Sequence, residues 1–247
     1  MVFFYGFTDK SGAFTLEHIL AINSKEHLKA LGLSLLLSFI STLICIILAY
    51  PLAMILAFSK IKKGSLIAII FILPMWMNFL LRTLAWQTLL EKTGVINQIL
   101  TFLHLPNITI INTPYAIILG MVYNFLPFMI LPIYNCLSKI DNNLINAAKD
   151  LGANSFQTLY KIIIPLSIPG IISGITMVFV PALTTFVISN LLGGSKILLI
   201  GNIIEQEFTQ ASNWHLGSGL SVVLMLFIII SMIITNITDK NEEVGSL

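Results

Sequence analysis

Five long apolar runs, almost free of charge, restrict this chain to folds that cross a lipid bilayer. They cover residues 30–58, 65–90, 114–137, 162–192 and 216–236. A helix of about 20 apolar residues spans the hydrocarbon core, and lipid offers no hydrogen-bond partners to an open strand. The composition agrees, with 57% hydrophobic residues, 10% charged residues and a mean hydropathy of +0.95. We therefore expect an all-α polytopic membrane protein, with one membrane domain over the 247 residues.

The run at 162–192 is longer than one straight span requires. It passes through Pro165, Pro169 and Pro181. Because proline removes a backbone donor and bends or ends a helix, we expect this run to be tilted, kinked or partly outside the bilayer.

The lysines predict the orientation, since cytoplasmic loops carry an excess of positive charge. The loops after the first and third runs and the C-terminal tail hold seven, Lys60, Lys62, Lys63, Lys139, Lys149, Lys161 and Lys240. The other side holds five in longer stretches, Lys10, Lys25, Lys29, Lys92 and Lys196. We therefore expect the loop at 138–165 and the C-terminus in the cytoplasm.

This orientation places the N-terminal segment outside the cytoplasm, although MVFFYGF has neither a basic region nor a cleavage site of a signal peptide. Two interpretations remain. The segment is the outer end of a first helix that begins before Met1, or the protein has five spans and an exported N-terminus.

The loop between the third and fourth runs contains NAAKDLGANSFQTLYKIIIP at 146–165. Asp141 or Asn142 can cap a first helix that carries Leu144, Ala148 and Leu151 at helical spacing, and Gly152 can end it in a left-handed conformation. A second helix, capped by Asn154 or Ser155, then leads through Phe156, Leu159 and Tyr160 into the fourth run. The pattern predicts a helix, a glycine turn and a second helix.

The spacing alone leaves the role of this loop open. Ala147 and Ala148 have almost no side chain, so the first helix can approach another surface closely and dock in a groove. A short amphipathic helix lying on the membrane fits the same spacing.

The segment resembles the signature of the permease subunits of ABC importers, in which Glu-Ala-Ala, three residues, Gly, nine residues, Ile, two residues and Pro form the cytoplasmic EAA loop that docks on the ATPase. The match falls on Asn146, Ala147, Ala148, Gly152, Ile162 and Pro165, with Asp150 and Leu151 inside it. Asn146 stands where the family carries Glu, so the charged contact of that position is lost while the spacing is kept.

More of the chain resembles one branch of that family, the spermidine/putrescine permeases of the PotB type. The stretches that carry this likeness are LPMWMNFLLRTLAW at 73–86, YNFLPFMILPIY at 123–134, DLGANSFQTLYKIIIPLSIPGIISG at 150–174 and GGSKILLIGNIIEQEF at 193–208. Permeases of this branch have six spans, one of them ahead of the segment where this sequence starts. The resemblance therefore favours a first helix that is missing here.

The resemblance implies a subunit of the bacterial inner membrane that does no covalent chemistry itself. Its expected partners are a second permease subunit of the PotC type, two ATPase subunits of the PotA type and an extracytoplasmic polyamine-binding protein of the PotD type. No Walker A motif occurs in the sequence, so we expect ATP and magnesium to be bound by the ATPase, with no cofactor on this chain.

Arg82 is the only charged residue inside any of the runs, which makes it a functional candidate. It follows Asn78 by four residues and Trp76 by six, so Asn78 and Arg82 can share a helix face. Because its charge would repel a cationic cargo, the alternative is that Arg82 pairs with a carboxylate or a lipid group near the outer interface.

No Asp or Glu lies within the runs, which suits a path that passes a polycation along without holding it tightly. Aromatic faces can attract a cation weakly, and the candidates are Trp76, Trp86, Tyr123, Phe128 and Phe186. Asn124 and Asn190 can add polar contacts where proline interrupts the helices. All of these residues also suit ordinary helix packing.

Glu205 and Glu207 lie in the outer loop, where they could meet the binding protein or remain solvated. The histidines, at 18, 27, 104 and 215, lack the spacing of metal ligands, so we expect no metal site. Alternative functions are an ABC importer for another small solute, a lipid enzyme embedded in the membrane, and a channel or structural subunit without an ATPase. The missing acids and histidines disfavour the enzyme, and the 146–165 pattern disfavours the channel.

Overall fold

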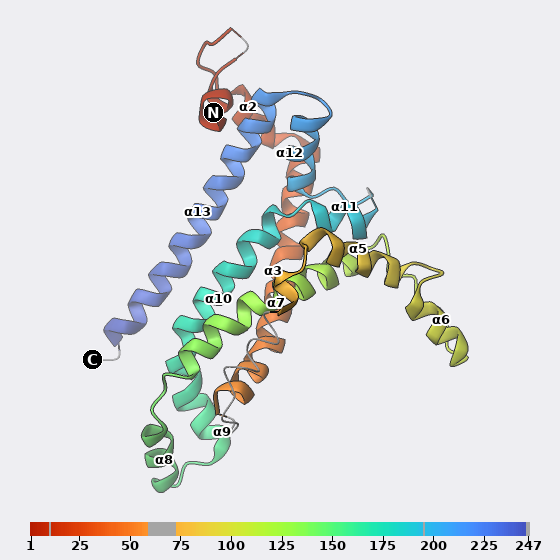
Figure 1. Ribbon diagram of the computed structural model, residues 1–247. Coiled ribbons are helices and arrows are strands. Elements are labelled where there is room, and N and C mark those ends of the chain that lie inside the picture. The colour runs from red at the N-terminus through yellow and green to blue at the C-terminus, as the bar shows by residue number, and fades with distance from the viewer. Residues whose placement is uncertain (10, 59–72, 195, 246–247) are drawn as a thin grey trace. The chain divides into compact units, whose positions relative to one another are not determined.

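The computed structural model describes residues 1–9, 11–58, 73–194 and 196–245, and their regular structure is helical (Figure 1). Within these ranges the β pairing is limited to one isolated bridge between Thr8 and Phe14. The helices are α1 (Val2–Phe7), α2 (Glu17–Leu20), η1 (Ala21–Asn23), α3 (Lys25–Phe58), η2 (Leu73–Trp76), α5 (Phe79–Leu90), α6 (Val95–Phe102), α7 (Pro114–Leu137), α8 (Asn142–Asp150), α9 (Ser155–Thr158), η3 (Leu159–Ile163), α10 (Ile164–Thr184), α11 (Val187–Gly193), α12 (Ile200–Thr209) and α13 (Trp214–Gly245).

Four helical stretches among the described residues are long and apolar enough to cross a membrane. They are Lys25–Phe58, Pro114–Leu137, Ser155–Thr184 and Trp214–Ile233. The all-helical prediction is confirmed. The start of the second apolar run, 65–72, lies outside the described residues, as do Lys60, Lys62 and Lys63. The described end of that run forms η2 and α5 rather than one continuous helix.

The long run at 162–192 is not one continuous α-helix. α10 ends at Thr184, and α11 begins at Val187 after two residues outside both helices. The break follows Pro181 by only a few residues, and the Thr184 hydroxyl donates back to the carbonyl oxygens of Val180 at 3.1 Å and Pro181 at 3.4 Å. The chain past the break therefore starts a new helix with its own direction.

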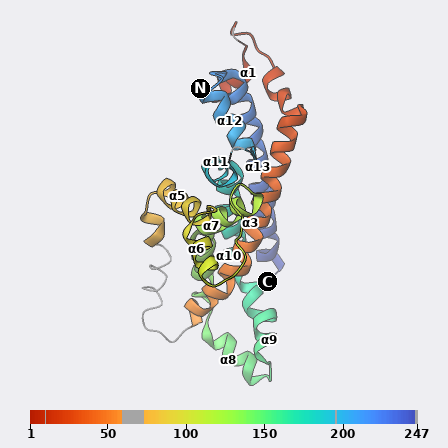
Figure 2. The same cartoon turned by 90° about the vertical axis from the view of Figure 1, so that its right-hand side faces the viewer.

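The described residues cluster into two compact units. Unit 1 comprises 1–41, 78–123 and 179–231, and unit 2 comprises 42–77, 124–178 and 232–247. In unit 1, a buried apolar cluster joins α3, α10, α12 and α13 through Leu31, Leu183, Ile200 and Leu224. α5 and α11 of the same unit lie side by side in both ribbon views (Figures 1 and 2).

In unit 2, α7 and α10 approach closely at two glycines four residues apart, Gly170 and Gly174. A Cβ atom at Gly170 would lie 2.7 Å from Cβ of Cys136, and one at Gly174 would lie 2.5 Å from Sδ of Met129. Small residues at this spacing are a common device for packing helices in lipid, where no hydrophobic force drives association. The hydroxyls of Tyr50 and Ser167 also lie within hydrogen-bond distance, at 3.0 Å, and join α3 to α10 in this unit.

Candidate functional site

The candidate coupling loop is a hairpin of two short helices in unit 2, α8 and α9 (Figure 1). Asp141 caps α8, with its Oδ1 atom accepting from the backbone N–H of Asn143 at 2.9 Å. Asn154 caps α9 in a reciprocal box. Its side chain accepts from the N–H of Gln157 at 2.8 Å, and the Gln157 side chain accepts from the N–H of Asn154 at 2.9 Å. Both caps confirm predictions from the sequence.

Gly152 makes the turn between the two helices, with φ of +83°. Its N–H donates to the carbonyl of Lys149 at 2.9 Å, and the N–H of Ala153 donates to that of Ala148 at 3.0 Å. This pair of bonds is the Schellman motif that ends a helix at a left-handed residue. The predicted left-handed glycine turn is confirmed.

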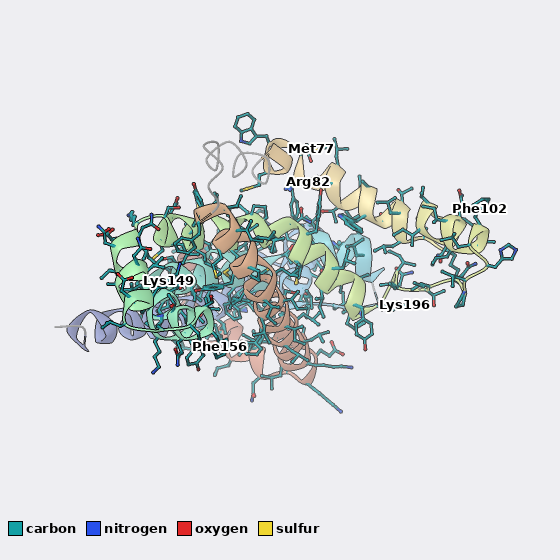
Figure 3. All side chains as sticks on the ribbon, turned by 90° about the horizontal axis from the view of Figure 1, so that it is seen from below. Met77, Arg82, Phe102, Lys149, Phe156 and Lys196 are labelled. Carbon is teal, nitrogen blue, oxygen red and sulfur yellow. The ribbon has the colours of Figure 1, made fainter. Side chains whose placement is uncertain are left out.

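Apolar side chains on this polar hairpin are exposed. Leu144, Ala147 and Leu151 follow one another at helical spacing on α8 and at its end, and Leu151 is 89% exposed. Phe156 on α9, labelled in Figure 3, is 72% exposed. Its ring stacks on that of Tyr160, with centroids 6.2 Å apart. We call Leu144, Ala147, Leu151 and Phe156 the hairpin patch. Exposed apolar residues surrounded by polar ones indicate an interaction surface.

Other residues of the signature lie away from the hairpin patch. Ala148 is buried within the chain, so the spacing of Leu144, Ala148 and Leu151 does not produce a single buried face. Asn146 lines a cavity of about 640 Å³ together with Phe58 at the end of α3. The remaining signature residues are the exposed Asp150, the half-buried Ile162 in η3 and the exposed Pro165 at the start of α10.

A π-helical turn, η3, joins the hairpin to α10. It covers Leu159–Ile163 and includes Ile162 of the signature. π turns are rare and occur frequently at functional positions. This turn was not predicted from the residue patterns.

The residues predicted for a translocation path are placed in several elements. Trp76 ends η2 and is 81% exposed. Asn78 is the N-cap of α5, and its Oδ1 atom accepts from the N–H groups of Leu80 at 2.8 Å and Leu81 at 3.3 Å. Arg82 lies one turn into α5 and is only 8% exposed (Figure 3).

Two of the predicted aromatic residues meet in unit 1. The rings of Trp86 and Tyr123 pack edge to face, with centroids 5.3 Å apart and planes inclined by 66°. Phe186 is partly exposed at the break between α10 and α11, whereas Asn124 is buried and Phe128 half-buried on α7.

Asn190 belongs to a buried polar network that sequence reasoning missed. Its center is Asn202, which is fully buried on α12. The Asn202 amide donates to Asn190 Oδ1 at 2.6 Å and to the Phe186 carbonyl at 3.2 Å. Its Oδ1 atom accepts from the Ser189 hydroxyl at 2.6 Å and the Leu199 N–H at 3.0 Å. A single Asn among apolar neighbours, in LLIGNII, was the only signal available.

The two glutamates that the sequence predicts for an outer loop lie on α12 in different settings. The Glu205 side chain accepts from the Thr209 hydroxyl at 3.0 Å. Glu207 lines a cavity of about 570 Å³ with Glu26, Lys29 and Lys196. The cavity wall therefore carries both signs of charge, as suits contact with another protein surface more than capture of a polycation.

Comparison with known proteins identifies the family. Residues 21–241 match the family described as binding-protein-dependent transport system inner membrane component. The chain belongs to this family. It is therefore a transport subunit, a multi-pass permease of the inner membrane.

Curated relatives agree with this assignment over most of their length. The permease is 37% identical over 235 residues to the spermidine/putrescine transport system permease protein PotB of Haemophilus influenzae. This alignment covers 93% of this chain and 82% of the relative. It is 40% identical over 215 residues to PotB of Escherichia coli, in an alignment that covers 86% of this chain and 78% of the relative.

Solved structures show the same fold at low sequence identity. A bacterial ABC transporter involved in the import of the acidic polysaccharide alginate matches with a TM-score of 0.79 and 17% identity, over 94% of this permease and 85% of that chain. The MetNI methionine ABC transporter matches with a TM-score of 0.64 and 18% identity, over 87% and 95%.

Proposed function

We propose that this permease forms the translocation path of a polyamine importer and couples it to an ATPase through the hairpin of α8 and α9. The hairpin patch is the observation that carries the coupling role, because it exposes Leu151 and Phe156 on an otherwise polar loop. The cargo assignment rests on the two relatives of 37% and 40% identity, whose names specify spermidine and putrescine.

The hairpin patch would fill a groove on the ATPase, with α8 laid along it as an amphipathic helix. Ala147 and the turn at Gly152 permit close approach, while Ala148 holds α8 onto its own chain. Asn146 faces a cavity of this chain and would act on the seating of the hairpin against α3 rather than on the ATPase surface. Asp150 would lie at the exposed edge of the hairpin, and Ile162 and Pro165 would fix the direction in which the hairpin joins α10.

ATP binding and hydrolysis, with the accompanying magnesium, would occur on two separate ATPase subunits. Their cycle would shift the permease between outward-open and inward-open states by contacting the hairpin differently in each state. A second permease subunit and an extracytoplasmic binding protein would complete the importer. This assembly would place the hairpin and the C-terminus in the cytoplasm, and the excess of lysines on that side supports this orientation.

A polyamine would pass along aromatic faces rather than carboxylates. Trp76 is the most exposed of the predicted aromatics, and the Trp86–Tyr123 pair and Phe186 offer further faces. Asn124 would contribute a polar contact, whereas Asn78 and Asn190 would hold the α5 start and the α11 region in shape through their hydrogen bonds. Glu207 and Glu205 would meet the binding protein on the outer side.

The test is ATP hydrolysis by the complete importer in proteoliposomes, measured with binding protein loaded with spermidine, putrescine or an unrelated solute. Polyamine-loaded binding protein should raise hydrolysis, and Leu151→Ser should abolish that rise while leaving the permease in the complex with its companion subunit. Stimulation only by another solute would refute the cargo, and a full response in Leu151→Ser would refute the coupling role.

A further inference from the structure

Asn202 fixes the direction of the buried hydrogen bonds at the start of α11. The Leu199 N–H can only donate and the Phe186 carbonyl can only accept, so the Asn202 amide has one permitted orientation. Its Oδ1 atom accepts from Leu199 at 3.0 Å, and its Nδ2 atom donates to Phe186 at 3.2 Å. The other Nδ2 hydrogen points to Asn190 at 2.6 Å. Asn190 must therefore turn its oxygen toward Asn202, and its own N–H groups are directed elsewhere.

The amide nitrogen of Asn190 is the accessible part of this network. Asn190 is half-buried, and among the described residues its Nδ2 atom is neither hydrogen-bonded nor enclosed. Phe186 lies one helical turn earlier, and its ring is 39% exposed. The Phe186 carbonyl is occupied, because it accepts from Asn202 and from the Asn190 backbone N–H at 2.9 Å. These two residues therefore offer an aromatic ring and N–H donors, but no open acceptor.

The backbone carbonyls at the end of α10 are occupied or covered as well. Those of Val180 and Pro181 accept from the Thr184 hydroxyl. Those of Thr184 and Thr185 lie against Gly201 on α12, so closely that a Cβ atom there would be 2.8 and 3.1 Å from their oxygens. In transporters, carbonyls at a broken helix and the negative end of the helix dipole attract cations. This break instead keeps those oxygens against other parts of the chain.

We propose that Asn202 is a positioning residue that prevents the break between α10 and α11 from holding a cationic cargo. It turns the N–H groups of Asn190 outward and occupies the Phe186 carbonyl, so a polyamine ammonium meets an aromatic face with no strong acceptor beside it. The cargo is then attracted weakly and released. This inference rests on the proposed function, which supplies the polyamine. It extends to the break the absence of acids within the apolar runs.

The change Asn190→Asp reverses the chemistry of one position with almost no change of shape. One carboxylate oxygen can accept from Asn202 as the amide oxygen does, and the other replaces the outward N–H groups with an acceptor. Radiolabelled spermidine should bind the importer in nanodiscs, without binding protein or ATP, about tenfold more tightly than it binds the wild type. The maximal rate of uptake into proteoliposomes should fall, because release becomes slow. Spermidine should be affected more than putrescine, since it carries more charge.

The change Asn202→Ala tests the positioning role without adding a charge. It frees the Asn190 amide to rotate its oxygen outward and removes one donor from the Phe186 carbonyl. Spermidine affinity should therefore rise, when it is measured below the unfolding temperature of the variant. A purely structural Asn202 would lower the unfolding temperature and leave the affinity of the folded importer unchanged.

Two further variants serve as controls. Gln98→Glu adds one negative charge at an exposed position of α6 and should change neither spermidine affinity nor uptake. Asn190→Ala removes the donors without adding an acceptor, so its affinity should lie between those of the wild type and Asn190→Asp. If Asn190→Asp does not fold, this comparison of Asn190→Ala with the wild type decides the question.

Equal spermidine affinity in the wild type and in the folded Asn190 and Asn202 variants would overturn the inference, because it would show that the ammonium does not reach the break. Weaker binding by Asn190→Ala at unchanged stability would also overturn it, since Asn190 would then be a cargo ligand. Polyamine-stimulated ATP hydrolysis by the wild-type importer is measured in parallel. Its absence rejects the proposed function, whereas its presence with unchanged affinities rejects only the positioning role.

Discussion

The turn at Gly152 supports a prediction that separates backbone conformation from side-chain crowding. Its φ is +83°, and a Cβ atom placed on it would meet nothing of this chain within 4 Å. Alanine there would be strained only by the left-handed backbone, at a cost of about 1–2 kcal/mol. Asparagine adopts this conformation more readily and ends helices in the same way. Proline would fix φ near −65° and remove the N–H that donates to Lys149 at 2.9 Å.

The strain falls on the turn that ends α8, outside the membrane-spanning helices, so it should unseat the hairpin rather than unfold those helices. A cost of 1–2 kcal/mol corresponds to a population change of about 5- to 30-fold. Gly152→Ala should lower the stimulated rate of ATP hydrolysis by up to that factor, Gly152→Pro should abolish stimulation, and Gly152→Asn should stay within about twofold of wild type.

The assay is ATP hydrolysis by the reconstituted importer with cargo-loaded binding protein, with basal hydrolysis of the ATPase subunits as the control. If Gly152→Asn loses as much as Gly152→Ala, the glycine is required for close approach to a partner and the conformational reasoning is wrong. Wild-type stimulation in Gly152→Pro would remove the hairpin from the coupling mechanism altogether.

Three further predictions concern residues in both units. Asn202→Ala should destabilise the permease by about 3 kcal/mol, because it leaves the buried Leu199 N–H and the Asn190 side-chain oxygen without the partner that Asn202 supplies. An unchanged unfolding temperature in detergent would contradict the network. Phe156→Ala should change stability by no more than about 0.5 kcal/mol, since the ring is 72% exposed, yet reduce stimulated hydrolysis; equal losses of both would indicate a packing role. Gly174→Val should cost about 1–3 kcal/mol through the clash with Met129, measured as a lower unfolding temperature, and a neutral result would mean that α7 and α10 separate easily.

Features that depend on neighbouring residues were predictable from the sequence. The caps at Asp141 and Asn154 and the turn at Gly152 form hydrogen bonds within a few residues of chain, so the local order of residue types was enough to place them. The helical structure of the apolar runs was equally predictable, because lipid provides no hydrogen-bond partners and a helix satisfies its own backbone groups.

Features that depend on distant segments could not be read in the same way. Asn202 is recognisable as a network center only when α11 and α12 are brought together, since its partners lie up to 16 residues away along the chain. Ala148 looked like part of a free face, but the fold buries it. The run at 162–192 was expected to be tilted, kinked or partly outside the bilayer, but its prolines did not show that the helix would end at Thr184.

The π turn between the hairpin and α10 changes what the fixed spacing of the signature means. The ten steps from Gly152 to Ile162 include the first four residues of η3, so the chain there contains a wider turn than an α-helix would make. Removing or adding one residue in an α-helix rotates everything beyond it by about 100°. The residue count therefore encodes helical phase as well as reach. A one-residue deletion in this stretch would leave the hairpin near its place but rotate the Phe156 side chain toward a different side.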